Sequence, residues 1–532
     1  MAGAAAENHG PDPKSLEMPP APPIQSISTA AEMTELYWMA LLRDVPLLAF
    51  EPSSGATQCF KVTAADRDLV NDALDELKKM FGDAIKLDAH LDGGLRLGLD
   101  LPKELILKNG CPCGERLDLD RATLFRSGLH DEQYGPLVSQ FFIRDIGYGV
   151  QNIDQKQTPY RMGKDFLTHH DDWLRAQNVG KDKFGRDYGI CNFYGDQLAM
   201  PNRETYYPNV KRHISTMRDL ARFVNRDALH QAYFNAALFL DGISAPLDSG
   251  NPYKGNLYSR EGAFATLGGP DLLTLVSEVA SRALKVVWRQ KWLVHRRCRP
   301  EVYAGLAQMQ FNGHIGVVNP NATNGDQNSL FRKRAYGLPA SVATTMAASR
   351  IMAHNQAQNG GTDATLFLPM AFSAGSPSHP AYGAGHATVA GACVTVLKAW
   401  FDEDAILRDA IAFAQTNQRR KDPGTLQGLL QPGARISGED FCPPQDYAGN
   451  DADKMTVGGE LNKIASNVAM GRTMGGVHWR SDNTRSLRLG EKIAIEILRK
   501  RTMEYAERPV SFTLRTFDRD MVRITNGQVV KF

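Results

Sequence analysis

The sequence predicts a mainly α-helical protein that ends in a small β-hairpin. The first observation is periodicity, because between residues 215 and 500 apolar side chains recur at helical spacing. The second is size: 532 residues, 42% of them hydrophobic and 23% charged, suffice for one large helical core or for several domains. The third is the tail, where Asn526-Gly527 separates two alternating segments and so indicates a hairpin.

Three regions are expected along the chain. Residues 1–28 are rich in Ala and Pro and should form a flexible arm. Residues 29–215 open with a capping-box pattern, Thr29 to Glu32, and continue as an N-terminal region of helices and loops. Residues 216–532 should form a helical-bundle region with the hairpin as its tail. In this region, helices are expected at 216–241, 271–298, 338–358, 386–416, 459–474 and 484–503.

Charge and cysteine usage argue against several classes of protein. The net charge is +2, so no global attraction to nucleic acid or to an anionic membrane is expected. No apolar run reaches the ~18 residues of a membrane span, and the first residues lack the features of a signal peptide. The seven scattered cysteines do not suggest a disulfide framework, which fits a reducing compartment. We therefore expect a cytoplasmic protein.

A first cluster of positive charge lies at the end of the helix expected at 271–298. Lys291, Arg296, Arg297 and Arg299 fall within nine residues. Pro300 disfavours helical geometry at Arg299, so the helix should end there. Favourable charge at a helix C-terminus is an alternative explanation for the cluster. Trp288, one turn before Lys291, would then be part of the core.

A second candidate is the stretch HPAYGAGHATV, residues 379–389, in which a glycine-bearing loop leads into an apolar helix. Pro380, Gly383 and Gly385 oppose helix formation and allow the backbone to approach a ligand closely. The N-terminus of the following helix offers N–H groups and a positive dipole to an anion. His386 would stand beside that anion as a proton donor or acceptor, although a structural histidine is the alternative.

The third candidate combines Arg472, His478 and Asp482 between two expected helices. Gly475-Gly476 can turn the chain so that Arg472 and His478 face one point. Asp482, four residues past His478, could accept the spare N–H of the imidazole and fix its orientation. It could instead, or in addition, cap the next helix.

Together the three clusters suit a tetrahedral oxyanion. Lys291, Arg299 and Arg472 supply cations, and the Gly385 N–H supplies a further donor. The cations would neutralise about three negative charges through charge-assisted hydrogen bonds. One histidine can bond the central atom while the other handles protons on the opposite side.

With these motifs in place, the sequence resembles the vanadium-dependent haloperoxidases, which share their pocket with type 2 phosphatidic acid phosphatases. The shared signature stands here as Lys291…Arg299-Pro300, then Ala384-Gly385-His386, then Arg472…His478…Asp482. The Lys-to-Arg interval of eight, and His379 seven residues before His386, resemble the bacterial and algal bromoperoxidase-like branch. The likeness covers roughly residues 30–532 and includes the stretches 32–44 and 456–466.

The resemblance implies an enzyme with helix bundles around its active site and with vanadate as cofactor, for which phosphate would compete. Such an enzyme oxidises bromide or chloride with hydrogen peroxide and halogenates electron-rich organic substrates. It also implies a homodimer or a larger homo-oligomer. By this resemblance, His478 would bind vanadium, and the vanadate oxygens would be contacted by Lys291, Arg299, Gly385 and Arg472. Lys291 would also polarise bound peroxide, and His386 would carry out acid–base chemistry. Trp288 and His379 would form the halide side, with support for the site from Asp482.

Two positions depart from the family pattern. Ala384 replaces the signature serine, which removes a hydroxyl contact of about 0.5–1.5 kcal/mol. Trp288 stands where related enzymes often carry Lys or Arg. Two alternatives share the same pocket: a homologue that rearranges a terpenoid-like substrate without halide, and an acid phosphatase with His478 as nucleophile and His386 as general acid. A non-catalytic scaffold is disfavoured, because buried cations without a ligand are costly.

Overall fold

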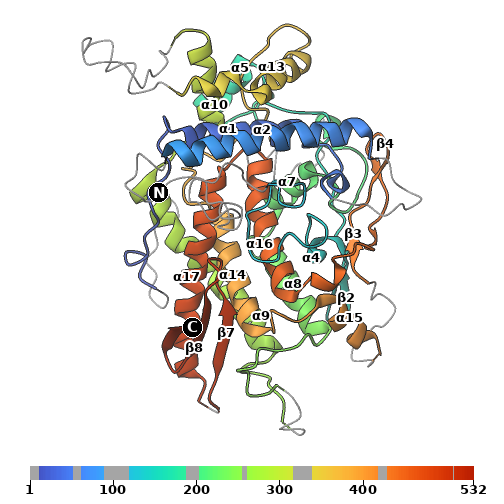
Figure 1. Ribbon diagram of the computed structural model, residues 1–532, viewed down its shortest axis with the longest axis vertical. Coiled ribbons are helices and arrows are strands. Elements are labelled where there is room, and N and C mark those ends of the chain that lie inside the picture. Colours follow the sequence, from blue (N-terminus) through green and yellow to red (C-terminus); the bar gives the residue numbers. More distant parts are fainter. Residues whose placement is uncertain are drawn as a thin grey trace.

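The computed structural model describes residues 11–51, 62–88, 119–186, 203–254, 261–314, 338–416, 428–506 and 508–532. Helices dominate these residues, as expected (Figure 1). None of the described helices combines the length and the apolar character that crossing a membrane requires.

The core is a bundle built around α14 (Gly385–Trp400). It packs against α9 (Gly269–Arg289), α16 (Val457–Met474) and α17 (Arg480–Glu504) (Figure 1). Every residue of α14 after His386 is buried, as is all of α16, so both are interior helices. The pocket described below lies at the N-terminal end of α14.

Close backbone contact joins α14 to α17. A Cβ atom on Gly391 would stand 2.0 Å from the carbonyl oxygen of Leu487, and one on Gly490 would stand 2.0 Å from that of Thr388. Neither position has room for a side chain, so the two glycines set how near the helices approach.

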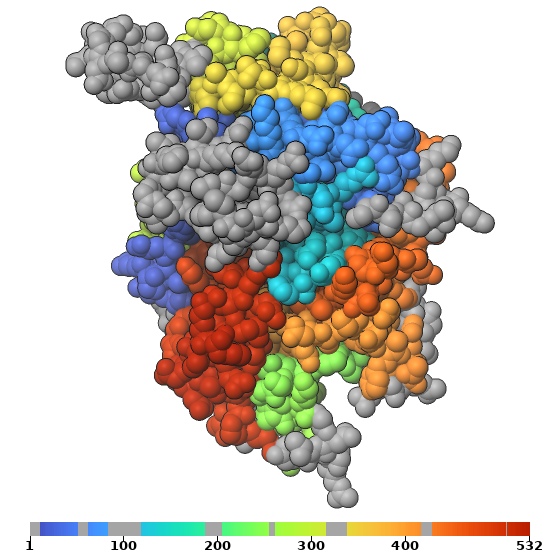
Figure 2. Space-filling view, in the orientation of Figure 1, coloured from blue at the N-terminus to red at the C-terminus, as the bar shows by residue number. Residues whose placement is uncertain are grey.

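A layer formed by α1 (Ile27–Leu41) and α2 (Ala64–Asp88) crosses the ends of α16 and α17 (Figure 1). On the face shown in Figure 2, α2 lies between the yellow segment that contains α13 above and the cyan segment below it. The expected capping box at Thr29 is wrong. The Ser26 side chain caps α1 instead, by accepting the Thr29 N–H at 3.1 Å, and Glu32 serves in a buried ion pair.

The other helical elements flank this bundle and layer. They are η1 (Leu47–Phe50), α4 (Gln140–Ile143), α5 (His170–Val179), α6 (Arg203–Tyr206), α7 (Met217–Arg226), α8 (Gln231–Gly242), η4 (Gln290–His295), α10 (Pro300–Phe311), α12 (Ser341–Thr344), α13 (Met346–Gln358), α15 (Leu407–Thr416) and η6 (Ala452–Lys454).

Several expected helices are interrupted. The segment 216–241 divides into α7 and α8, because the backbone becomes extended at Asp227. The segment 386–416 divides into α14 and α15 after an extended Phe401, and 338–358 divides at Thr345, whose side chain caps α13. Apolar periodicity continues through each break, so it does not mark these boundaries.

Residues 11–26, which belong to the expected flexible arm, lie against the bundle instead. The carbonyl of Leu16 accepts a hydrogen bond from Gln290 at 2.7 Å, and that of Pro19 accepts one from the Tyr382 hydroxyl at 2.6 Å. Met18 is buried. An extended proline-rich chain has no internal hydrogen bonds, so its carbonyls remain available to partners elsewhere.

The predicted hairpin is confirmed and is part of a three-stranded sheet. Strands β8 (Met521–Thr525) and β9 (Gln528–Lys531) pair with Thr525 opposite Gln528, which leaves Asn526 and Gly527 as the turn. Both turn residues have positive φ, as a tight two-residue turn requires. Strand β7 (Ser511–Arg515) pairs antiparallel with β8.

The remaining strands form short antiparallel pairs. They are β1 (Ile146–Tyr148) with β2 (Gln151–Ile153), β3 (Leu430–Gln431) with β6 (Gln445–Asp446), and β4 (Arg435–Ser437) with β5 (Asp440–Phe441).

Among the described cysteines, Cys442 departs from expectation. Cys442 is disulfide-bonded, whereas Cys298 and Cys393 carry free thiols. Scattered spacing in the sequence therefore does not exclude a bond between positions that the fold brings together.

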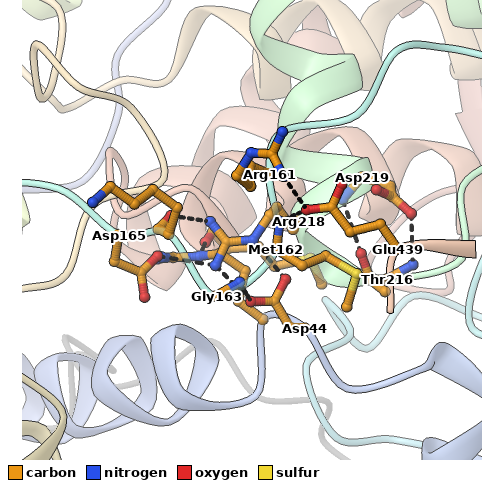
Figure 3. A network of polar contacts seen from close by, with 12 residues as sticks. Asp44, Arg161, Met162, Gly163, Asp165, Thr216, Arg218, Asp219 and Glu439 are labelled. Atoms are coloured by element: carbon orange, nitrogen blue, oxygen red, sulfur yellow. Dashed lines mark hydrogen bonds and ion pairs between the residues drawn. The ribbon is translucent and has the colours of Figure 1, made fainter. Parts of the chain in front are cut away.

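A buried ionic network joins the end of α1 to α7 and to the loop at 161–165 (Figure 3). Arg218 contacts Asp44 at 2.6 and 2.7 Å and Asp165 at 3.1 Å, and Arg43 also pairs with Asp165. Burial alone would raise the pKa of Asp165, but Arg43 and Arg218 lower it below its ordinary value. The ionised carboxylate therefore stabilises the folded state.

We expect Asp165→Asn to lower the free energy of unfolding by about 3–5 kcal/mol, because it leaves two buried guanidinium groups short of a counter-charge. Urea titration measures the loss. Asp171→Asn is the control, since the Asp171 side chain is 81% exposed, and it should be near neutral. A loss no larger than that of the control would show that the network adds nothing to stability.

Candidate active site

Arg299 is the point at which the three sequence clusters meet. Its guanidinium donates to the carbonyls of His379 at 2.9 Å and of Val477 at 2.7 Å. Its two terminal nitrogens lie 3.0 Å from His478 Nε2 and 3.0 Å from His379 Nδ1. The predicted convergence of these segments is therefore present in the fold, although they are up to 179 positions apart in sequence.

Lys291 lies in η4, a π-helical turn that continues α9 and ends at Arg296, whose φ is positive. Its ammonium group is buried and donates to the Pro380 carbonyl at 2.7 Å, and it lies 5.6 Å from the Trp288 ring. Burial, with the nearby Arg299 charge, lowers the pKa of Lys291 well below its ordinary value. An ammonium has three N–H donors, so an anion in this pocket would satisfy donors that the single carbonyl cannot.

The four cations of the first cluster point to different places. Lys291 and Arg299 face the pocket, while Arg296 is exposed. Arg297 lies behind the pocket, where it donates to Asp482 at 2.8 Å and to Glu32 at 2.9 Å. The Arg297 guanidinium bridges two carboxylates and so supports the pocket, and Arg297 also lines the cleft that leads to it.

Asp482 performs both of the roles that the sequence left open. Its Oδ2 atom lies 3.0 Å from His478 Nδ1 and also accepts the Trp479 N–H at 3.0 Å, in the first turn of α17. Burial and the charges of Arg299 and Lys291 lower the pKa of His478 well below its ordinary value. The ring is therefore neutral, with its proton on Nδ1 toward Asp482 and a lone pair on Nε2 facing Arg299.

Arg472, in the last turn of α16, is also buried. It donates to the Val224 carbonyl at 2.8 Å and to Asn225 Oδ1 at 3.0 Å, both near the end of α7. The Phe372 ring centroid lies 5.8 Å from its guanidinium carbon. These contacts hold the Arg472 guanidinium in place, beside the turn that leads from α16 to His478.

His386, in the first turn of α14, has a carboxylate partner that sequence reasoning missed. Its Nε2 atom lies 3.0 Å from Oδ1 of Asp227, the residue that ends α7, 159 positions earlier in the chain. The Asp227 side chain is 3% exposed and the His386 side chain 22%, so the carboxylate is buried while the imidazole remains partly accessible. The helix end at Asp227 is the one feature of the sequence that could have pointed to this partner of His386. No helix end was predicted there.

The loop before α14 presents an open helix N-terminus. Ala384 occupies the N-cap position with extended backbone and provides no side-chain cap. Its own N–H donates to Ser486 Oγ at 2.8 Å, and its methyl group is buried. Among the described residues, the Gly385 N–H donates to no side chain and to no neighbouring segment. It is therefore available to an anion.

A cleft of about 650 Å³ reaches this pocket from outside. Arg299, His379 and Pro380 form its inner wall, and residues at the end of α5 form another side. The His379 ring lies 4.9 Å from the Trp288 ring. Burial, together with Lys291 and Arg299, lowers the pKa of His379 to about 2, so its ring is neutral at ordinary pH.

Comparison with known proteins leads to the family that the sequence motifs resemble. A family model for the second helical-bundle domain of VCPO matches residues 332–507. The vanadium-dependent bromoperoxidases of Corallina pilulifera and Corallina officinalis are each 32% identical, over 98% of this chain and 78% of theirs. That of Ascophyllum nodosum is 28% identical over 98% of this chain and 76% of its own.

A solved structure agrees over nearly the whole chain. The homohexameric second vanadate-dependent bromoperoxidase of Ascophyllum nodosum superposes with a TM-score of 0.70, at 26% identity, over 99% of this chain and 77% of its own. The helical bundle, the converging motifs and the identity over most of the chain lead to one conclusion: this chain belongs to the vanadium-dependent haloperoxidase family.

Proposed function

We propose that the protein is a vanadate-dependent haloperoxidase that oxidises bromide or chloride with hydrogen peroxide and halogenates an electron-rich organic compound. Family membership supports the reaction class. The observation that carries the proposal is the His478 Nε2 lone pair, directed into a pocket that holds the buried side chains of Lys291, Arg299 and Arg472.

The residues present fit a vanadate ion. Lys291, Arg299, Arg472 and the Gly385 N–H would hold its oxygens, and His478 Nε2 would bond the metal. When bound, vanadate supplies a Lewis acid that remains oxidised. The buried Lys291 ammonium, with its single carbonyl partner, supports this assignment, because an anion would offset the cost of placing that charge in the interior.

His386 is proposed as the residue that moves protons. Asp227 engages Nε2 and so leaves Nδ1 to take a proton from hydrogen peroxide as it enters the pocket. The same carboxylate stabilises the imidazolium that results. Lys291 donates an N–H to a substrate oxygen and polarises it.

The halide and the organic substrate are proposed to enter through the 650 Å³ cleft. His379 lines this cleft and its ring contacts that of Trp288, so the two would form the halide side. A neutral His379 leaves Arg299 as the positive group at this wall, which can attract a halide ion. Phosphate is proposed as a competitor for the cofactor site, since it presents the same tetrahedral oxygens.

We also propose a homo-oligomer, supported by the homohexameric relative from Ascophyllum nodosum.

The reaction is tested by bleaching of monochlorodimedone with hydrogen peroxide and either bromide or chloride. Chelator-treated protein should bleach the dye only after orthovanadate is added, and excess phosphate should delay recovery. Absence of bleaching in a folded protein would contradict the proposal. Release of nitrophenol from an aryl phosphate by the same protein would then indicate a phosphatase.

Asp227→Asn should lower kcat by about 10- to 100-fold, because it removes the carboxylate that orients His386. Vanadate affinity should change little, since Asp227 contacts none of the proposed oxyanion ligands. Asp409→Asn, at a side chain that is 66% exposed, is the matched control. A kcat equal to that of the control would show that Asp227 has no part in the reaction.

Ala384→Ser should tighten vanadate binding by about 2- to 12-fold, because the new hydroxyl adds one hydrogen bond to the oxyanion. The measurement is the concentration of orthovanadate that restores half of the bleaching activity. Ala387→Ser, one turn into α14, adds a hydroxyl at another buried position and controls for general effects on the helix. Equal or weaker vanadate binding in Ala384→Ser would show that position 384 does not face the oxyanion.

A further inference from the structure

Outside the pocket, the hairpin of β1 and β2 brings two carboxylates together. Ile146 pairs with Ile153 at the open end of the hairpin, so Asp145 and Asp154 flank this last pair on opposite strands. Like charges opposite one another destabilise a strand pair by about 0.2–1 kcal/mol. A bound cation would convert this repulsion into attraction.

A histidine from a distant segment completes the cluster. His213 Nε2 lies 3.8 Å from Asp145 Oδ1, and one ligand atom from each of Asp145, Asp154 and His213 lies within 4.8 Å of the other two. The His213 side chain is only 10% exposed. Its ring pairs with the carboxylate of Asp145. The ring nitrogen faces the Asp145 carboxylate across 3.8 Å, a gap that a cation bound by both groups would bridge.

The fold holds these three side chains in place. Arg212 pairs with Gln157 through two backbone hydrogen bonds of 2.9 and 3.0 Å, which fixes His213 beside the hairpin. The Arg212 side chain is locked to Asp219 at 2.8 and 3.0 Å. Backbone N–H groups of Gln155 and Lys156 orient the carboxylates of Asp145 and Asp154, at 3.3 and 2.9 Å.

We infer that Asp145, Asp154 and His213 bind a divalent transition-metal ion such as Zn²⁺ or Mn²⁺. One imidazole and two carboxylates match the ligand preference of these ions, whereas Ca²⁺ and Mg²⁺ prefer all-oxygen sites. The two carboxylates supply two negative charges, and their exposed positions leave room for water ligands. The adjacent Lys156 limits the net charge of the site.

The metal would stabilise one wall of a second cleft, of about 240 Å³. Asp154 and Lys156 line this cleft together with Asp227, the partner of His386. Cross-linking the hairpin to the segment before α7 would therefore stiffen the surroundings of α7, whose end carries Asp227. The role assigned to the metal is structural.

Metal binding is tested on the full chain after chelator treatment, without peroxide, halide or vanadate, so that the result is separate from activity. Isothermal titration with Zn²⁺ should show a single tight site, and Co²⁺ should give a visible absorption band. His213→Gln and Asp154→Asn should weaken Zn²⁺ binding by about tenfold or more and remove the Co²⁺ band.

Two exposed positions provide controls. His170→Gln and Asp440→Asn remove a histidine and an aspartate elsewhere on the surface, and both should bind Zn²⁺ as the parent chain does. Unchanged Zn²⁺ binding in His213→Gln and Asp154→Asn would overturn the site. Equal affinity for Ca²⁺, unaffected by His213→Gln, would also overturn it, because the imidazole would then play no part. Circular dichroism confirms that each variant is folded.

Discussion

The concentration of positive charge at the start of α14 is the constraint on which the rest of the structure depends. Lys291, Arg299 and Arg472 are buried side by side, where mutual repulsion and loss of water both oppose the folded state. The surrounding elements compensate: carbonyls of the turns that flank the pocket accept their N–H groups, and the positive N-terminus of α14 adds its own field. An anion bound here would offset this repulsion, so its retention would be coupled to folding.

Carboxylates around the pocket supply negative charge that supports its cations and histidines. Asp482 and Asp227 each orient one histidine, and Arg297 and Glu32 in turn hold Asp482. The same electrostatic logic explains why the two histidines differ. His478 is buried among cations and neutral, as its proposed role as a metal ligand requires, whereas His386 is partly exposed beside a carboxylate, as its proposed role in proton transfer requires.

The sequence was sufficient for the helical class, the hairpin and the residues that meet in the pocket, because these depend on local periodicity and on motifs of fixed spacing. It was insufficient where a partner comes from a distant segment. Asp227 lies at a helix end that apolar periodicity does not mark, and the packing of residues 11–26 depends on side chains such as Tyr382. Cys442 is bonded for the same reason: pairing depends on proximity in the fold, which spacing does not encode.

The ion pair between Glu32 and Arg297 has a consequence for biosynthesis. Glu32 also accepts the Ser481 N–H, 449 positions later in the chain, so α1 cannot satisfy its buried carboxylates until nearly the whole protein has been made. At about 5–20 residues per second, α1 leaves the ribosome about 20–90 s before α17. During this interval α1 can pack against α2, but the carboxylates of Glu32 and Glu35 lack their arginine partners. The support of the pocket by Glu32 is therefore completed only late in translation.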